Sequence, residues 1–174
     1  MFKKIIIPTD GSSLANMAAL HGIELASKIG AEVASIFVAR EKQNPNYDSS
    51  EDRTIADPSD TEYKKAVQEA ADRYMQPLKD AAAKAGVKFS QLVCISNETA
   101  MSIATEAQNN GGDLIYMGSH GYTGWAKLLM GSVAAKVFAA SAVPVLIYKF
   151  PKEEVTKKQV RKSYLEYFED MPPA

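Results

Sequence analysis

The stretch that decides the fold is residues 4–12, which read KIIIPTDGS. The β-branched run at 5–7 predicts a short strand, and the Pro-Thr-Asp-Gly sequence that follows it predicts a turn. Ser12 or Ser13 then supplies an N-cap for a helix whose apolar residues recur at helical spacing until Gly30. The stretch therefore predicts a strand, a tight loop and a helix, which is the start of a βαβ unit.

The same alternation of strand and helix continues along the chain. Strands are expected at four further places, and a helix is expected between each pair; the four strand segments are 33–38, 89–95, 114–117 and 143–148. Apolar strands that alternate with helices predict parallel pairing, helices on both faces of the sheet and right-handed crossovers. We therefore predict an α/β domain with a five-stranded parallel sheet.

Three local features refine this prediction. Residues 41–63 hold seven acidic and two basic residues and two Asn-Pro or Asp-Pro pairs, which predicts a long acidic loop. The Ser-x-x-Glu sequence at 59–62 is typical of a capping box, so we expect the second helix to start there and to kink at Pro77. Asn97 is the expected N-cap of the third helix, and the fourth helix is expected to start near Ser132.

The chain divides into a domain at 1–150 and an extension at 151–174. Four apolar residues of the extension are spaced as on one side of a helix: Val160, Tyr164, Tyr167 and Phe168. We expect an amphipathic helical tail that packs on its own domain, with docking to a partner protein as the alternative. The single cysteine, Cys94, excludes an intramolecular disulfide and a Cys-rich zinc site.

Charge and hydropathy exclude several classes of partner. The 20 basic and 21 acidic residues of the 174-residue chain give a net charge of −1, so no strong positive field attracts nucleic acid or an anionic membrane. The apolar run near the N-terminus is too short for a signal peptide, and no stretch reaches the about 20 apolar residues of a membrane-spanning helix. We expect a soluble cytoplasmic protein.

Two loops have the composition of a ligand site. One is the loop at 8–12 after the first strand, and the other is the glycine-rich stretch from Gly118 to Ser132 after the fourth. Open parallel sheets bind ligands at the carboxyl ends of strands where neighbouring connections diverge. If both loops serve one site, the strand order is 3-2-1-4-5. Glycine amides, the helix start and the His120 side chain then form a phosphate cradle; the alternative is a glycine-rich turn needed only for chain geometry.

The spacing of the second loop identifies a family. The chain contains neither G-x-G-x-x-G nor the P-loop sequence, which disfavours a dehydrogenase or a P-loop motor. It does contain G-x2-G-x9-G-[ST] at 118–132, and this pattern resembles the nucleotide-binding signature of universal stress proteins. The flanking residues 113–121, the opening 4–12 and the segment 141–147 also resemble that family, so the resemblance spans residues 3–149.

The resemblance implies an ATP site, with Mg²⁺ expected beside the phosphates and AMP or ADP as other possible ligands. By analogy, the adenosine pocket is lined by Pro8, Thr9, Asp10 and Val38, and the ribose lies against Met117 and Gly118. The phosphates are held by the remaining matched positions, namely His120, Gly121, Gly131, Ser132 and Val133. ATP-binding members often carry Thr or Ser where this chain has Ala134, so one hydroxyl on the phosphate side is missing.

The function expected from this site is nucleotide-responsive regulation in the stress response. The motif offers backbone amides and one histidine rather than the cationic clamp and positioned metal of a fast phosphoryl-transfer enzyme, so we expect binding rather than efficient catalysis. A slow ATPase or phosphotransferase, and a dimeric scaffold that binds no nucleotide, are the alternatives. The uncharged strand at 143–148 is expected at the sheet edge, where the resemblance implies a homodimer.

Overall fold

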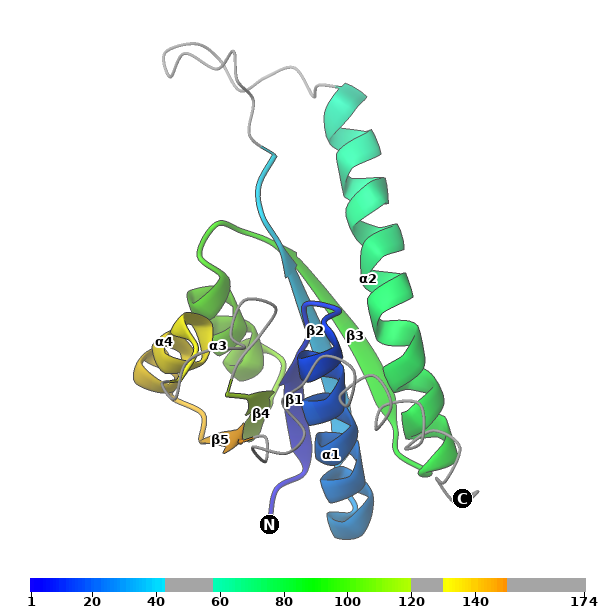
Figure 1. Ribbon diagram of the computed structural model, residues 1–174, viewed down its shortest axis with the longest axis vertical. Coiled ribbons are helices and arrows are strands. Elements are labelled where there is room, and N and C mark those ends of the chain that lie inside the picture. The colour runs from blue at the N-terminus through cyan, green and yellow to red at the C-terminus, as the bar shows by residue number, and fades with distance from the viewer. Residues whose placement is uncertain (43–57, 120–129, 150–174) are drawn as a thin grey trace.

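The five strands form one parallel sheet in the order β3-β2-β1-β4-β5, as expected from the sequence. The computed structural model describes residues 1–42, 58–119 and 130–149, with the side chains of 58 and 59 excepted (Figure 1). The expected acidic loop lies mostly, and the tail from 150 onward entirely, outside these residues. The elements in chain order are β1 (Lys4–Pro8), α1 (Ser13–Ile29), β2 (Glu32–Ala39), α2 (Pro58–Lys84), β3 (Phe89–Ile95), α3 (Thr99–Asn109), β4 (Leu114–Gly118), α4 (Ser132–Ala140) and β5 (Val145–Tyr148).

The sheet separates two hydrophobic clusters. On one face α1 and α2 pack on Ile5, Ile7 and Val33, and on the other face α3 and α4 pack on Ile6, Ala34 and Ile115. Successive residues of β1 thus point to opposite faces, and both sides of the central strands are buried. β1 and β4 are neighbours in the sheet, so their carboxyl ends lie side by side between the two helix layers (Figure 1).

Helix α1 begins and ends as the sequence predicts. The Ser12 side chain accepts a hydrogen bond from the backbone N–H of Ala15, with a donor–acceptor distance of 3.2 Å, so Ser12 rather than Ser13 is the N-cap. Gly30 ends the helix with a φ of 68°, and the backbone N–H of Ala31 donates to the Ala26 carbonyl. This helix therefore returns the chain into β2 through a glycine turn.

Helix α2 differs from its prediction at its start. It begins at Pro58, so the Ser-x-x-Glu sequence lies inside the first turns and not at the N-cap; proline suits the first turn because its missing N–H has no helical partner there. The helix also continues through Pro77 as one element to Lys84. Met75 and Leu78 flank the proline and are fully buried, and Leu78 belongs to the core cluster on the α1–α2 side of the sheet.

Two further boundaries correct the sequence interpretation. Asn97 does not cap α3: its amide accepts from the Glu41 N–H and donates to the Glu41 carboxylate, at 3.3 and 3.0 Å, and α3 begins after Glu98 without a side-chain cap. Strand β5 starts at Val145 rather than at 143, because the Ser141 hydroxyl holds Val143 in a turn. None of the helices in the described residues is long and apolar enough to cross a membrane.

Candidate functional site

The strand order places the two predicted loops side by side. β1 pairs with β2 on one side and with β4 on the other, so the loops after Pro8 and after Gly118 leave the same edge of the sheet from neighbouring strands. Val38 lies near this edge at the end of β2, beyond Ile36, which pairs with Pro8. The predicted site residues that the structure describes therefore gather at one edge, as a switch point requires.

The loop after β1 is fixed by the Thr9 hydroxyl. Thr9 is buried; its Oγ1 donates to the Asn16 side-chain oxygen at 3.0 Å and accepts from the Gly11 N–H at 3.1 Å. Its own backbone N–H donates to the Ile36 carbonyl of β2 at 2.9 Å. The Thr9 side chain thus points into the protein, where it shapes the loop, and the buried Asn16 on α1 is a supporting residue that the sequence analysis missed.

The Asp10 side chain is exposed at the edge. One carboxylate oxygen accepts the backbone N–H of Ser12 at 2.9 Å, which is the turn that aspartate often makes before a helix. This bond orients the carboxylate at the entrance of α1. Of the three residues predicted in this loop, Asp10 is the exposed one, whereas Thr9 is buried and Pro8 is half-buried.

Helix α2 packs directly on the same loop through Tyr74. Gly11 has a φ of 75°, and a Cβ added to it would lie 2.4 Å from the Tyr74 ring. The Tyr74 ring also packs edge-on against Phe37 of β2, with 5.4 Å between ring centroids. Tyr74 thus forms one wall of the β1 loop; in the sequence it recurs at helical spacing with other apolar residues such as Val67 and Leu78, which predicts a buried helix face but not a contact with this loop.

The loop after β4 leaves and returns at one point. The backbone N–H of Ser119 donates to the Tyr148 carbonyl of β5, and the N–H of Gly131 donates to the Ser119 carbonyl, both at 2.8 Å. The start of α4 is therefore fixed against the end of β4. His120 and Gly121, predicted to hold phosphates, lie outside the described residues.

Helix α4 starts at this edge with open amide groups. Gly131 is its N-cap residue and forms no side-chain cap bond, and the first helical bond runs from the Ala135 N–H to the Gly131 carbonyl. The amides before Ala135 have no partner within the helix and carry the positive end of its dipole. Ser132 and Val133 are exposed, whereas Ala134 is buried in the core. The methyl group of Ala134 thus faces the sheet and not the open edge.

Apolar residues lie beneath the start of α4. Met117 of β4 is a buried member of the cluster between the sheet and the α3–α4 layer, and Val38 of β2 is half-buried against it. Both predicted contacts for base and ribose therefore lie on the sheet face from which α4 begins. This arrangement offers an apolar surface next to a set of backbone donors.

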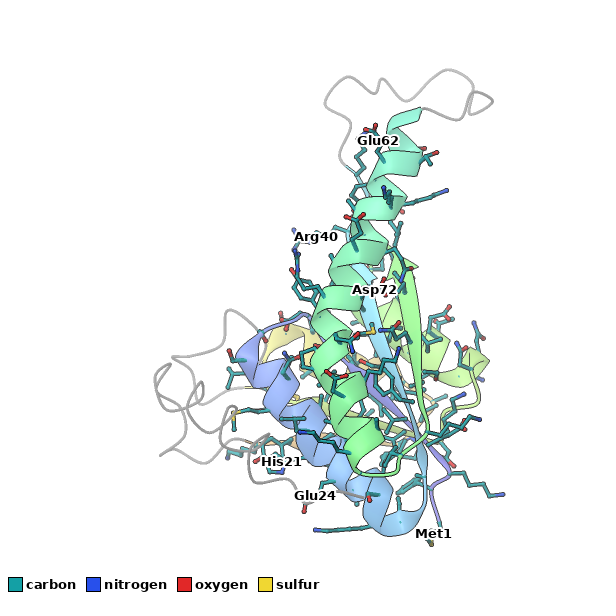
Figure 2. All side chains as sticks on the ribbon, turned by 90° about the vertical axis from the view of Figure 1, so that its right-hand side faces the viewer. Met1, His21, Glu24, Arg40, Glu62 and Asp72 are labelled. Atoms are coloured by element: carbon teal, nitrogen blue, oxygen red, sulfur yellow. The ribbon has the colours of Figure 1, made fainter. Side chains whose placement is uncertain are left out.

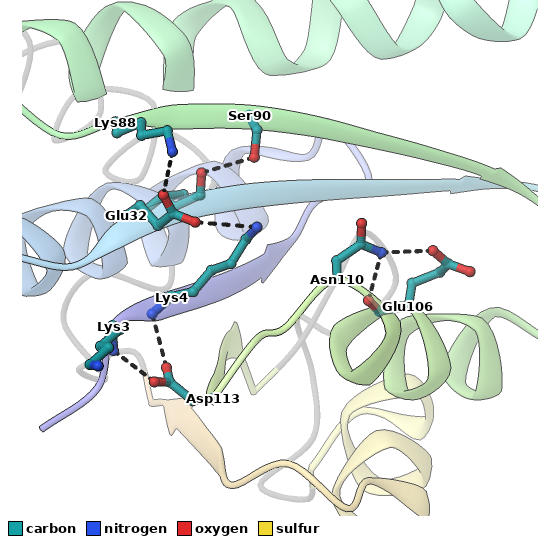
Figure 3. Close-up of polar contacts among 9 residues, drawn as sticks. Lys3, Lys4, Glu32, Lys88, Ser90, Glu106, Asn110 and Asp113 are labelled. Carbon is teal, nitrogen blue, oxygen red and sulfur yellow. Dashed lines mark hydrogen bonds and ion pairs between the residues drawn. The ribbon is translucent and has the colours of Figure 1, made fainter.

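The charged cluster of the sheet lies at its opposite edge (Figure 3). The Glu32 carboxylate pairs with Lys88 at 2.8 Å and with Lys4 at 3.2 Å, and these hydrogen bonds, Lys88 first, lower the pKa of Glu32. In return, Glu32 raises the pKa of Lys88. An open depression of about 650 Å³ in this region is lined by these three side chains. Since their charges pair with one another at the amino ends of the strands, we assign the depression a structural role.

No group of three or more potential metal-ligating side chains occurs among the described residues. The described part of the candidate site thus consists of backbone amides, one exposed carboxylate and an apolar floor. This set can bind an anion that carries an apolar group.

Comparison with known proteins gives one consistent family. A model of the universal stress protein family matches residues 1–149. The chain is 33% identical over 157 residues to the universal stress protein MJ0531 of Methanocaldococcus jannaschii, which covers 88% of this chain and 86% of that protein.

Solved structures agree with the observed fold. The structure of MJ0577, from the same archaeon, is 30% identical, with a TM-score of 0.69 over 87% of this chain and 99% of that one. A universal stress protein family structure from Arabidopsis thaliana, solved with AMP bound, has a TM-score of 0.60 over 90% of this chain and 97% of that one. At 14% identity this last likeness concerns the fold alone.

Proposed function

The chain belongs to the universal stress protein family, and on that premise we propose that it is a regulatory protein of the stress response that binds an adenine nucleotide, with ATP as its preferred ligand. The proposed site lies at the carboxyl edge of the sheet, between the loops after β1 and β4. Its expected location in the cell is the cytoplasm.

One observation carries this proposal: α4 begins with a glycine cap at the edge where the β1 and β4 loops meet. Backbone N–H groups at a helix start favour a phosphate. In the proposed complex the amides of Ser132 and Val133 donate to the phosphates, and Gly131 leaves room for them to approach. His120 and Gly121 complete the phosphate side in this proposal, and Gly118 lies beside the ribose.

The adenosine would lie on the other side of the same edge. Val38 and Met117 supply an apolar surface for base and ribose, and Pro8, Thr9 and Asp10 form the adjoining wall. Since the Thr9 hydroxyl bonds inside the loop, we assign Thr9 a shaping role and Asp10 the polar contact. The AMP-bound Arabidopsis relative supports an adenine nucleotide as the ligand class.

Magnesium would enter with the nucleotide. Mg²⁺ commonly takes one or two carboxylates, phosphate oxygens and several waters. Asp10, the exposed carboxylate of the described β1 loop, is assigned to adenosine, so the ion would be held by phosphate oxygens and water.

We propose binding rather than efficient turnover. The proposed phosphate contacts are mainly backbone amides, which stabilise a bound nucleotide in its ground state as well as during reaction and therefore do not by themselves accelerate hydrolysis. A measurable ATPase rate that is lost in site variants would identify the slow-ATPase alternative instead.

The test compares two aspartate substitutions in α4 by calorimetry with ATP, ADP and AMP. Gly131→Asp places a carboxylate at the proposed phosphate position, while aspartate is itself a good N-cap, so the helix should still form. We expect an affinity loss for ATP of at least about tenfold, or 1.4 kcal/mol. The control Ala139→Asp adds the same charge at an exposed position near the end of the helix and should leave affinity unchanged.

Equal ATP affinity of Gly131→Asp and wild type would exclude the phosphate assignment. The mass of a small molecule released from freshly purified protein would identify the nucleotide carried from the cell. If no nucleotide is released and none binds, the non-nucleotide scaffold is the correct function.

The proposed assembly is a homodimer through β5. This strand is the last in the sheet order, and its sequence, VLIY, carries no charge that would discourage pairing. The same strand of a second chain, antiparallel across a two-fold axis, is the simplest cover.

A further inference from the structure

One face of β5 is only partly covered by the helices that the structure describes. On the α3–α4 side, α4 packs on β5; on the other side, α1 packs on β1, β2 and β4 and α2 on β2 and β3. This follows from the topology (Figure 1). α1 connects β1 to β2 and α2 connects β2 to β3, so neither helix crosses over β5. Among the described residues, α1 reaches this face of β5 at Tyr148, whereas Leu146 remains 38% exposed.

The side chains on this face of β5 are apolar. Leu146 pairs in register with Tyr116, which is buried beneath α1, so Leu146 and Tyr148 point to the α1 side. Tyr116 is 6% exposed, whereas Leu146 is 38% exposed. His21, on the side of α1 turned away from α2 (Figure 2), stacks on Tyr148 with 4.5 Å between ring centroids. We call His21, Leu146 and Tyr148 the β5 strip.

The chain leaves the sheet at the strip itself, since Tyr148 is the last residue of β5. The family match ends at residue 149, so the 25 residues from 150 to 174 are an addition to the domain. They carry the apolar stripe Val160, Tyr164, Tyr167 and Phe168. Pro151 precedes the stripe and Pro172 follows it, as proline does at helix ends.

We propose that residues 157–171 form a helix that packs its apolar stripe on the β5 strip of the same chain, beside α1. Fifteen helical residues span about 22 Å, which exceeds the about 13 Å of the four residues of β5, so such a helix can cover the whole strand. Residues 150–156 form the turn, with a reach of up to about 23 Å. A segment tethered to the last residue of the strip has a high effective concentration there, which favours this occupant over a separate protein.

Disulfide trapping in the full-length protein tests the placement directly. With Cys94→Ser as background, Leu146→Cys is combined in turn with Tyr164→Cys, Tyr167→Cys and Phe168→Cys, and oxidation is followed by electrophoresis and mass. The control pairs are Leu146→Cys with Lys162→Cys and with Glu169→Cys, which lie on the opposite side of the expected helix. At least one stripe pair should form an intrachain disulfide about tenfold faster than either control, since disulfide geometry is demanding.

A thermodynamic cycle gives an independent readout. Tyr164→Ser should lower the unfolding midpoint by about 2–4 °C, and it should have little effect when Leu146→Ser is already present, because contacting residues are not additive. Lys162→Ser should change nothing.

Equal trapping of stripe and control pairs, or strictly additive midpoint shifts, would overturn the proposal. Disulfides that join two chains would also overturn it, because they would place the tail on a second copy. Neither readout depends on nucleotide, so the outcome is separate from that of the proposed function.

Discussion

At the scale of single residues, the β1 loop is shaped by packing from two helices. The Thr9 hydroxyl bonds to Asn16 of α1, and Gly11 lies against the Tyr74 ring of α2. Gly11 is therefore required both for its backbone conformation and for the space that a side chain would fill. Asp10 lies between Thr9 and Gly11, and the contacts of these two neighbours hold it at the carboxyl edge of the sheet.

Gly11→Ala separates these two requirements when it is compared with Gly30→Ala. Both glycines have a positive φ, 75° and 68°, but a Cβ at Gly30 meets no atom within 4 Å. Gly30→Ala should therefore cost only the left-handed strain, about 1–2 kcal/mol. Gly11→Ala should cost about 1–3 kcal/mol more because the Tyr74 ring must move. Chemical denaturation measures both, and equal costs would show that Tyr74 yields freely.

Asp10→Ala tests whether the carboxylate contacts adenosine. If it does, ATP affinity should fall by on the order of 1.5–3 kcal/mol, while inorganic triphosphate should bind as before. Asp10→Asn is the matched control for the loop, because its side-chain oxygen can still accept the Ser12 N–H. Equal losses for ATP and triphosphate would place Asp10 on the phosphate side instead, beside the magnesium ion.

At the scale of elements, the sequence predicted the existence and order of every strand and helix in the described residues, because each has its own periodicity. Boundaries were wrong where a distant contact decided them. Asn97 has the residue type of an N-cap, but Glu41 at the end of β2 takes its hydrogen bonds. At the start of α2 the sequence offered two signals, the capping-box residues at 59–62 and Pro58, and the structure begins the helix at the proline.

The amino ends of three strands are joined by one carboxylate. Glu32 of β2 binds Lys4 of β1 and Lys88 just before β3, while Asp113, just before β4, accepts the backbone amides of Lys3 and Lys4 (Figure 3). These contacts lie outside the proposed binding edge. They should therefore affect stability without affecting ligand affinity.

Glu32→Gln should give a pH-dependent loss of stability. The pKa of Glu32 is lowered from its ordinary 4.5, mainly by the hydrogen bond from Lys88 and then by that from Lys4. The ion pairs therefore stabilise the fold fully above pH 4.5, and their contribution disappears as the pH falls through the lower pKa of the folded state. At neutral pH the variant should unfold no more than about 3 °C below wild type, because partly exposed pairs are weak.

The measurement is the midpoint of thermal unfolding against pH for wild type, Glu32→Gln and Glu69→Gln. Glu69 is an exposed carboxylate of α2 that lies 3.9 Å from Lys65, and its substitution should have little effect. The difference in unfolding midpoint between wild type and Glu32→Gln should become smaller in acid and at high salt. A gap that widens as the pH falls would contradict the assignment.

At the scale of the whole molecule, the strand order followed from a functional argument. Two glycine-containing loops could share a site only if β4 lies beside β1, and the sheet has that order. The part of the site that sequence could not supply is its support. Asn16 and Tyr74 belong to helices that meet the β1 loop only after folding, and no local pattern marks either residue as part of the site. Ala134 is the opposite case, because the sequence suggested a site role that the structure does not support. Its motif position predicted a contact on the phosphate side, whereas the structure buries its side chain in the core.

β5 is the outermost strand on its side of the sheet, and the outward side of its backbone can pair with another strand. The Pro144 and Tyr148 carbonyls accept hydrogen bonds from β4, so the alternation of a parallel pair turns the backbone of Val145 and Ile147 to the outside. A second β5 would pair with these two residues. Ile147→Pro removes one outward N–H and should convert a dimer into a monomer, because proline on an edge strand blocks pairing there.

Sedimentation at tens of micromolar protein distinguishes two ways of covering the outward side of β5: the β5 strand of a second chain, or the tail of the same chain. With a β5 dimer, the full chain is dimeric, Ile147→Pro is monomeric, and a chain ending at residue 150 remains dimeric. If the tail covers the edge instead of the face, the full chain is monomeric and the shortened chain associates. The placement of the tail on the β5 strip is compatible only with the first pattern, since a helix on the face leaves the backbone of the edge open. A monomeric full chain would therefore remove the proposed dimer, and association of the shortened chain would then place the tail across the edge.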